Sequence, residues 1–165
     1  MHNKKTIMTL HGYESSNTGP KTDKLQETYN VINPKINFAE KDCYNNLITL
    51  ANKHKPQLIV GSSMGGYLGY SLSNETNIPC LLFNPALIET FSGNIKPDVQ
   101  IPSNTCSRKF IVIGKHDDVV NPVLLKKWLN ENANNAVVFD ENIGHRIPID
   151  VYIDKVKYVM GLLTF

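Results

Sequence analysis

The stretch LIVGSSMGGYLG, residues Leu58–Gly69, places two adjacent serines between an apolar run and a cluster of glycines. Its first residues have the composition of a buried strand, and the residues after the serines suit a helix. The pattern G-x-S-x-G is met by residues 61–65, and only Ser63 stands at its centre. A sharp turn from strand to helix strains the backbone of its central residue and exposes the hydroxyl above a sheet. Ser63 is therefore a candidate nucleophile, whereas Ser62 does not fit the pattern.

Five short apolar runs predict the strands of the sheet. Their apolar residues are consecutive rather than alternating, which is typical of strands buried on both faces. The runs are Thr6–Leu10, Gln57–Gly61, Pro79–Asn84, Lys109–Gly114 and Ala136–Asp140. A weaker run at Tyr29–Ile36 is interrupted by Pro34 and suits an edge strand.

Stretches with helical spacing alternate with these runs. They are Lys41–His54, the residues after Ser63, Asn121–Ala133 and Asp150–Leu163. In the third stretch, Asn121 is the expected cap and Pro122 the first helical residue. Its expected buried residues are Leu124, Leu125, Trp128 and Leu129. The alternation predicts an α/β fold, with a mostly parallel sheet of about six strands and helices on both faces. In such a sheet, functional groups gather at the carboxyl ends of the strands.

Length and composition favour one globular domain over residues 1–165. The chain is 41% hydrophobic and 19% charged, and its formal net charge is +2. Scattered lysines do not favour a nucleic-acid partner. No apolar run is long enough for a membrane span, so we expect no membrane partner and a cytoplasmic protein. The spacing of the three cysteines indicates neither disulfides nor a zinc site. The segment Pro85–Ser107 is too short for a separate domain and leaves little material for a lid, so we expect an open, shallow site.

A serine nucleophile needs a base that is itself oriented by an acid. His145 is the best candidate base, because it lies between the last predicted strand and the last predicted helix. Asp117 and Asp118 both follow the strand Lys109–Gly114, so both emerge at the edge of the sheet that carries Ser63. Either could be the acid, while the other caps the turn that follows.

Two backbone N–H groups are candidates for an oxyanion hole. Met64 opens the helix after the turn, where its N–H points toward an oxyanion formed at Ser63. Tyr13 follows His11 and Gly12 in the loop after the first strand. We expect His11 to support this loop rather than to act as a base.

These motifs together resemble the α/β-hydrolase superfamily. The matching segments are LHGYESS, IVGSSMGGYLG, NPAL, GKHDDVV and IGHRI, in the chain order Ser, Asp, His that this superfamily uses. Within the superfamily the chain is similar to the small YqiA-like esterases, from Met8 to the last predicted helix. The resemblance implies a minimal α/β-hydrolase fold without a cap domain. The family's acid stands in a G-x-x-D-x-V context, which residues 114–119 satisfy and which favours Asp117 over Asp118.

Carried over to this sequence, the resemblance implies a serine esterase or thioesterase that works through an acyl-enzyme, on a small-molecule acyl substrate and without metal or cofactor. The implied residues are Ser63 as nucleophile, His145 as base, Asp117 as acid, and the N–H groups of Tyr13 and Met64 as the oxyanion hole. Two alternatives are a binding protein with an idle triad and an amide or peptide hydrolase. Arg146 is expected to face solvent, with attraction of an anionic substrate as the alternative. The acyl group, the leaving group and the oligomeric state are left open.

Overall fold

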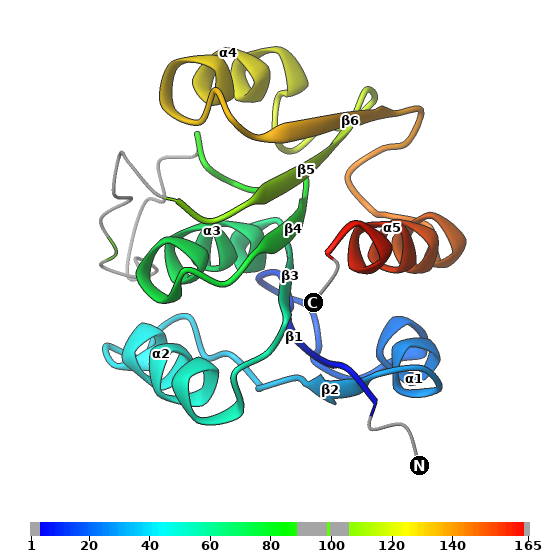
Figure 1. Ribbon diagram of the computed structural model, residues 1–165. Helices are drawn as coiled ribbons and strands as arrows, with labels where there is room; N and C mark the ends of the chain where they lie inside the picture. Colours follow the sequence, from blue (N-terminus) through cyan, green and yellow to red (C-terminus); the bar gives the residue numbers. More distant parts are fainter. Residues whose placement is uncertain (1–3, 89–98, 100–105, 164–165) are drawn as a thin grey trace.

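A computed structural model describes residues 4–88, 99 and 106–163, which form a six-stranded parallel sheet with helices on both faces (Figure 1). The strands are β1 (Thr6–Leu10), β2 (Asn30–Ile32), β3 (Leu58–Ser62), β4 (Cys80–Phe83), β5 (Lys109–Gly114) and β6 (Val137–Glu141). The helices are α1 (Pro20–Gln26), α2 (Cys43–His54), α3 (Met64–Thr76), α4 (Pro122–Asn132) and α5 (Ile149–Leu162). The strand order is β2-β1-β3-β4-β5-β6. The predicted α/β fold and parallel sheet are confirmed.

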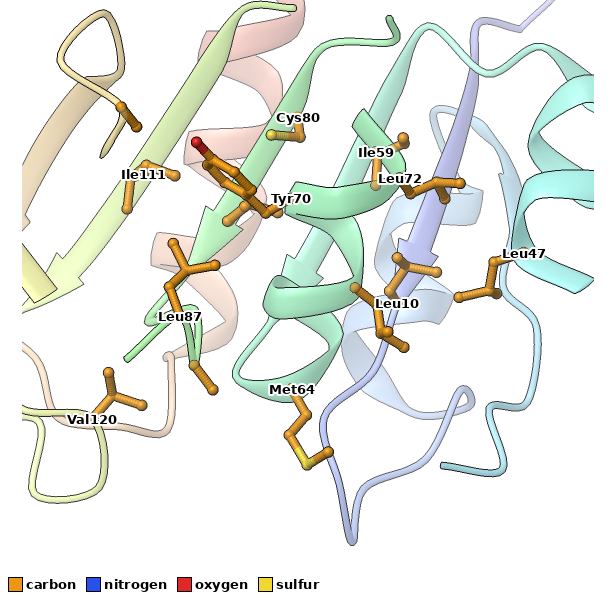
Figure 2. Packing of buried hydrophobic residues seen from close by; sticks show 14 of the residues in the cluster. Leu10, Leu47, Ile59, Met64, Tyr70, Leu72, Cys80, Leu87, Ile111 and Val120 are labelled. Atoms are coloured by element: carbon orange, nitrogen blue, oxygen red, sulfur yellow. The ribbon is translucent and has the colours of Figure 1, made fainter. Parts of the chain in front are cut away.

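Neighbouring residues of the central strands face opposite sides of the sheet and build two separate cores. Met8 and Ile59 belong to the core beneath α2, α3 and α4, part of which Figure 2 shows. Ile7 and Val60 belong to the core beneath α1 and α5. This alternation follows from the two-residue period of a strand, and burial on both faces explains the uninterrupted apolar runs.

The two edges of the sheet differ from its centre. The expected edge strand is confirmed as β2, which is only three residues long and ends two residues before Pro34. The expectation that β6 is buried on both faces is wrong, since Val137 and Val138 are 46% and 40% exposed. As the last strand, β6 has a neighbour on only one side, and α4 and α5 leave part of it uncovered.

The structure confirms the four expected helices and corrects two details. The Asn121 side chain accepts hydrogen bonds from the N–H groups of Val123 and Leu124, so the predicted cap of α4 is present. The expectation that Leu124 is buried is wrong, because this side chain is 54% exposed. It lies about 100° around the helix from Leu125, which is buried. The short helix α1 was not predicted from the sequence.

None of the helices in the described part of the chain is long and apolar enough to cross a membrane. In these same residues all elements belong to the sheet or to its two helical layers, without a cap domain. The expectation of an open site without a lid concerned Pro85–Ser107, most of which lies outside the described residues.

The contact between β3, α3 and the end of β1 depends on glycines. A Cβ atom on Gly65 would collide with the carbonyl oxygens of Leu10 and His11, and one on Gly61 would collide with the backbone of Gly65 and Gly66. These are backbone contacts, which cannot move away as the end of a flexible side chain can. Glycine at both ends of the G-x-S-x-G pattern therefore allows the turn to lie against the first strand.

We predict that Gly65→Ala lowers the free energy of unfolding by about 3 kcal/mol, because the new methyl group meets backbone on two sides. Gly161→Ala is the control, since a Cβ atom there meets nothing within 4 Å on the exposed side of α5. This control should raise stability by about 0.5 kcal/mol through its helix propensity. Urea unfolding followed by circular dichroism measures both, and equal midpoints for the two variants would contradict the packing described here.

Candidate active site

The carboxyl ends of four strands bring the predicted site residues to one edge of the sheet. Ser63 follows β3, Asp117 lies three residues after β5, and His145 lies four residues after β6. Tyr13 lies in the loop after β1. Strand order reverses at β1, whose neighbours β2 and β3 lie on opposite sides of it. Such a reversal point is where parallel α/β sheets form their binding crevices.

Ser63 has the strained backbone that its position in the turn predicts. Its φ and ψ are 53° and −118°, a combination that residues other than glycine rarely adopt. Hydrogen bonds hold it on both sides. The Ser63 N–H donates to the Phe83 carbonyl oxygen at 3.0 Å, and its own carbonyl accepts from the N–H groups of Tyr67 and Ala86, each at 3.0 Å. The strain is therefore imposed by β4 and the segment that follows it.

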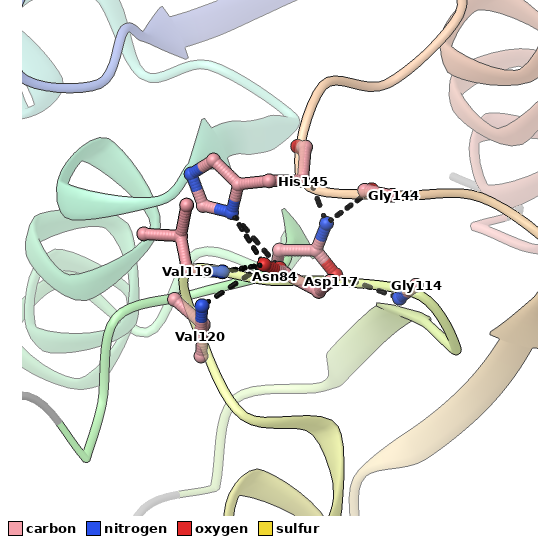
Figure 3. Close-up of polar contacts among 7 residues, drawn as sticks. All are labelled: Asn84, Gly114, Asp117, Val119, Val120, Gly144 and His145. Carbon is pink, nitrogen blue, oxygen red and sulfur yellow. Dashed lines mark hydrogen bonds and ion pairs between the residues drawn. The ribbon is translucent and has the colours of Figure 1, made fainter.

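Asp117 and His145 form a direct side-chain contact (Figure 3). The His145 Nδ1 lies 3.0 Å from Oδ1 and 2.9 Å from Oδ2 of Asp117. The Asp117 Oδ1 also accepts from the N–H groups of Val119 and Val120, at 2.8 and 2.9 Å. The side chain of Asp117 is only 1% exposed, whereas Asp118 is exposed. Of the two neighbouring acids, the structure pairs Asp117 with the histidine.

This pairing decides the orientation of the His145 ring. The Asp117 carboxylate accepts hydrogen bonds from two backbone N–H groups and therefore acts as the acceptor toward His145 as well. The proton of the contact with His145 is then carried by Nδ1. In neutral imidazole the other ring nitrogen, Nε2, then has a free lone pair. Figure 3 shows Nε2 on the side of the ring away from Asp117. The geometry thus leaves a proton acceptor at the edge of the sheet.

Ser63 and His145 line one cavity of about 850 Å³. Met64, Ala86, Val119 and Val120 supply apolar surface to the same cavity. Among the described residues, the Ser63 hydroxyl makes no hydrogen bond with His145 within 3.5 Å. Serine–histidine contacts are often long in the absence of substrate, so this spacing fits a resting site.

The two residues predicted to supply the oxyanion donors line the same cavity as Ser63. Met64 is the first residue of α3, where a backbone N–H has no partner within its helix. Tyr13 lines the same cavity as Met64, and the adjoining Gly12 lies so close that a Cβ atom there would be 3.4 Å from the Cβ of Ser63. The structure therefore brings both residues to the serine.

His11 supports the loop that contains Tyr13, as expected. Its Nε2 accepts from the Ile36 N–H at 2.9 Å, and its Nδ1 lies 2.8 Å from the Gly12 carbonyl oxygen. Both ring nitrogens are therefore engaged with backbone groups. The rings of His11 and Tyr13 also pack edge-on against Phe38, and their centroids lie 5.9 and 6.0 Å, respectively, from the centroid of the Phe38 ring. A histidine bonded at both nitrogens is a poor base.

Asn84 is a site residue that the sequence interpretation did not identify. It directly follows β4, is 1% exposed, and has a φ of 43°. Its Oδ1 accepts from the Gly114 N–H at 2.7 Å, and its Nδ2 donates to the carbonyl oxygens of Gly144 and His145, at 3.1 and 3.3 Å. Figure 3 shows that this side chain joins the end of β5 to the loop that carries His145. Asparagine before Pro85, directly after a buried strand, is the signal that could have revealed it.

None of Cys43, Cys80 and Cys106 lines the cavity that Ser63 and His145 share. Cys80 is fully buried in β4, and burial raises the pKa of its thiol to about 11, so it is a core residue as expected and not a thiolate nucleophile. Within residues 4–88, 99 and 106–163, no group of three or more His, Cys, Asp or Glu side chains could hold a metal ion.

We predict that Asn84→Ala lowers the free energy of unfolding by about 2–3 kcal/mol. The change leaves the buried Gly114 N–H without its acceptor and puts alanine at a positive φ, which asparagine tolerates better. Asn142→Ala is the control in the same region, because Asn142 is exposed and bonds only to His116 among the described residues. Its unfolding midpoint should stay close to that of wild type. A similar loss in both variants would contradict the role given to Asn84.

Comparison with known proteins supplies independent information on this fold. A model of the uncharacterised protein family UPF0227 matches residues 6–107. No sequence among the curated proteins matches the chain significantly. A crystal structure from Xanthomonas campestris pv. campestris, assigned to the α/β hydrolase superfamily, is 18% identical, with a TM-score of 0.71 and 98% of each chain covered.

Two further solved structures have the same fold. Est1E from Butyrivibrio proteoclasticus is 15% identical, with a TM-score of 0.72 and with 99% of this chain and 89% of that chain covered. The type II thioesterase BorB, from the borrelidin biosynthetic cluster, is 14% identical, with a TM-score of 0.68 and coverage of 99% and 91%. At these identities the likeness concerns the fold alone.

Proposed function

This chain belongs to the UPF0227 family and has the fold of α/β hydrolases, and on that basis we propose that it is a serine hydrolase that cleaves a carboxylic ester or a thioester. The observation that carries the proposal is the contact of His145 with buried Asp117, on the edge of the sheet that presents Ser63 from a strained turn. These are the parts that acyl transfer by a serine requires.

In the proposed first step, His145 Nε2 takes the proton of the Ser63 hydroxyl as the oxygen attacks the substrate carbonyl. A tetrahedral intermediate forms, and its oxygen accepts hydrogen bonds from the N–H groups of Tyr13 and Met64. The imidazolium that results is stabilised by the Asp117 carboxylate, which stays ionised. His145 then returns the proton to the leaving alcohol or thiol, and the acyl group remains on Ser63.

The second step releases the acid by the same route. His145 takes a proton from a water molecule, whose oxygen attacks the acyl-enzyme carbonyl. The tetrahedral intermediate collapses with the proton returning to Ser63, so that the free acid leaves and the enzyme is restored. Every proton in this sequence passes through His145, and the acyl group is transferred only to Ser63 and then to water.

Esters and thioesters are preferred over amides as substrates because an alkoxide or thiolate leaves more readily than an amine. BorB, which has the same fold, is a type II thioesterase. We therefore include thioesters among the proposed substrates. A screen should include both bond types.

We predict that purified protein hydrolyses 4-nitrophenyl butyrate and that Ser63→Ala lowers kcat by at least about a thousandfold, because the nucleophile is lost. Absorbance of released 4-nitrophenol measures the rate. Ser62→Ala, which removes the neighbouring hydroxyl, is the matched control and should keep most of the activity. Equal rates for wild type and Ser63→Ala would reject the proposed nucleophile.

We also predict that Asp117→Asn lowers kcat by roughly a hundredfold or more, whereas Asp118→Asn changes it less than about threefold. The first substitution replaces the acceptor that orients His145 Nδ1, and the ring can then take the wrong tautomer. The second alters an exposed carboxylate that makes no hydrogen bond or ion pair with His145 within the described part of the chain. The same assay measures both variants. A larger loss of kcat in Asp118→Asn than in Asp117→Asn would show that Asp118, and not Asp117, is the acid.

A further inference from the structure

A second cavity adjoins Ser63 and differs in charge from the first. It has a volume of about 570 Å³, and Ser63 and His145 line it as well as the 850 Å³ cavity. Among the described residues, Lys21 and Arg146 both line the second cavity, together with one acid, Glu14. The described lining of the first cavity has Arg146 but not Lys21, and it has two acids, Glu14 and Asp118. Positive charge therefore predominates in the second cavity.

Lys21 is a half-buried cation without an acidic partner among the described residues. It is the second residue of α1, and its Nζ lies 5.0 Å from the centre of the buried Tyr152 ring. This cation–π contact and the surrounding apolar atoms take the ammonium partly out of water. Burial accordingly lowers the pKa of Lys21 from its ordinary value. A partly desolvated ammonium gains more from an anionic ligand than a fully solvated one.

Arg146 supplies a second cation to the same cavity. It directly follows His145 and is exposed. In the part of the chain that the structure describes, no carboxylate lies within 4.0 Å of its guanidinium, Glu14 included. Ser15 and Ser62 also line the cavity and add polar surface to it. Two cations and these serines form a set of groups suited to an anion.

The two cavities meet at Ser63, so a substrate whose scissile bond lies there can extend one end into each. The first cavity offers the apolar surface of Met64, Ala86, Val119 and Val120, and its two acids disfavour an anion. The second offers Lys21 and Arg146. The distribution of charge thus distinguishes the two ends of the substrate.

We infer that the substrate carries an anionic group on one side of its ester or thioester bond, and that Lys21 and Arg146 hold this group in the second cavity. The inference rests on the proposed function, because it takes Ser63 as the reacting residue. It names a class of substrate, an acyl compound with an apolar end and an anionic end.

The test compares each anionic ester with the neutral form in which its carboxylate is methylated. One pair carries the charge on the leaving group: 3-carboxyphenyl butyrate and its methyl ester. The other carries it on the acyl group: 4-nitrophenyl hydrogen adipate and its methyl ester. In at least one pair, wild type should favour the charged ester in kcat/KM by roughly tenfold, the value of one hydrogen bond to a charged group. Lys21→Met and Arg146→Gln should each remove most of that preference, measured as the ratio of kcat/KM for the charged ester to kcat/KM for its methyl ester.

Lys127→Met is the matched control, because it removes the same charge from an exposed position on α4 that lines neither cavity. It should leave the preference unchanged. Neutral esters turned over without a charge preference in either pair would overturn the inference while the proposed function stands. An equal loss of preference in Lys127→Met would also overturn it, since net charge alone would then explain the effect.

Binding to Ser63→Ala separates this inference from the hydrolytic activity. Nuclear magnetic resonance titration should give a lower Kd for the charged member of the preferred pair than for its methyl ester, by a similar factor. The additional substitution Lys21→Met should make the two Kd values equal. If wild type hydrolyses no ester, the proposed function fails. The titration alone then tests whether the second cavity binds an anionic group. Equal Kd values of Ser63→Ala for the charged esters and their methyl esters would reject the inference.

Discussion

The strained backbone of Ser63 is the constraint on which the rest of the site depends. A φ of 53° with a ψ of −118° costs free energy, about 1–3 kcal/mol for such an outlier, and persists only where neighbouring contacts impose it. Here the constraint comes from hydrogen bonds to Phe83 on the adjacent strand β4 and to Ala86 just after it, and from the close contact of Gly65 with the end of β1. The turn therefore connects three neighbouring strands, and it places the serine beside the reversal point of the sheet.

Asn84 extends this arrangement to the histidine. Ser63, Asp117 and His145 come from three separate strand ends, so their relative positions depend on how those ends are held together. One buried amide bonds to Gly114, at the end of β5, and to the carbonyl groups of Gly144 and His145. The backbone beside Asn84 also supports the strained turn at Ser63. The segment after β4 thus positions both the nucleophilic turn and the loop of the base.

The sequence allowed most of this architecture to be predicted, because buried parallel strands are uninterrupted apolar runs and the G-x-S-x-G turn has few alternatives. It did not reveal α1, which buries only Leu25 and so has no helical stripe. The exposure of Val137 and Val138 depends on which strand lies last in the sheet, and local apolarity carries no such information. Asn84 and the contact that singles out Asp117 required the loops to be placed in space, since residues distant in sequence form them. The same is true of the cavity shared by Lys21 and Arg146.

The central claim is that Ser63 is an activated nucleophile, and covalent labelling tests it most directly. Wild type, Ser62→Ala and Ser63→Ala are treated with a fluorophosphonate and analysed by intact-mass spectrometry, beside a known serine hydrolase. The account predicts one adduct on wild type and on Ser62→Ala, and none on Ser63→Ala. If the known hydrolase is labelled and wild type is not, or if Ser63→Ala gains the same adduct, the claim is contradicted.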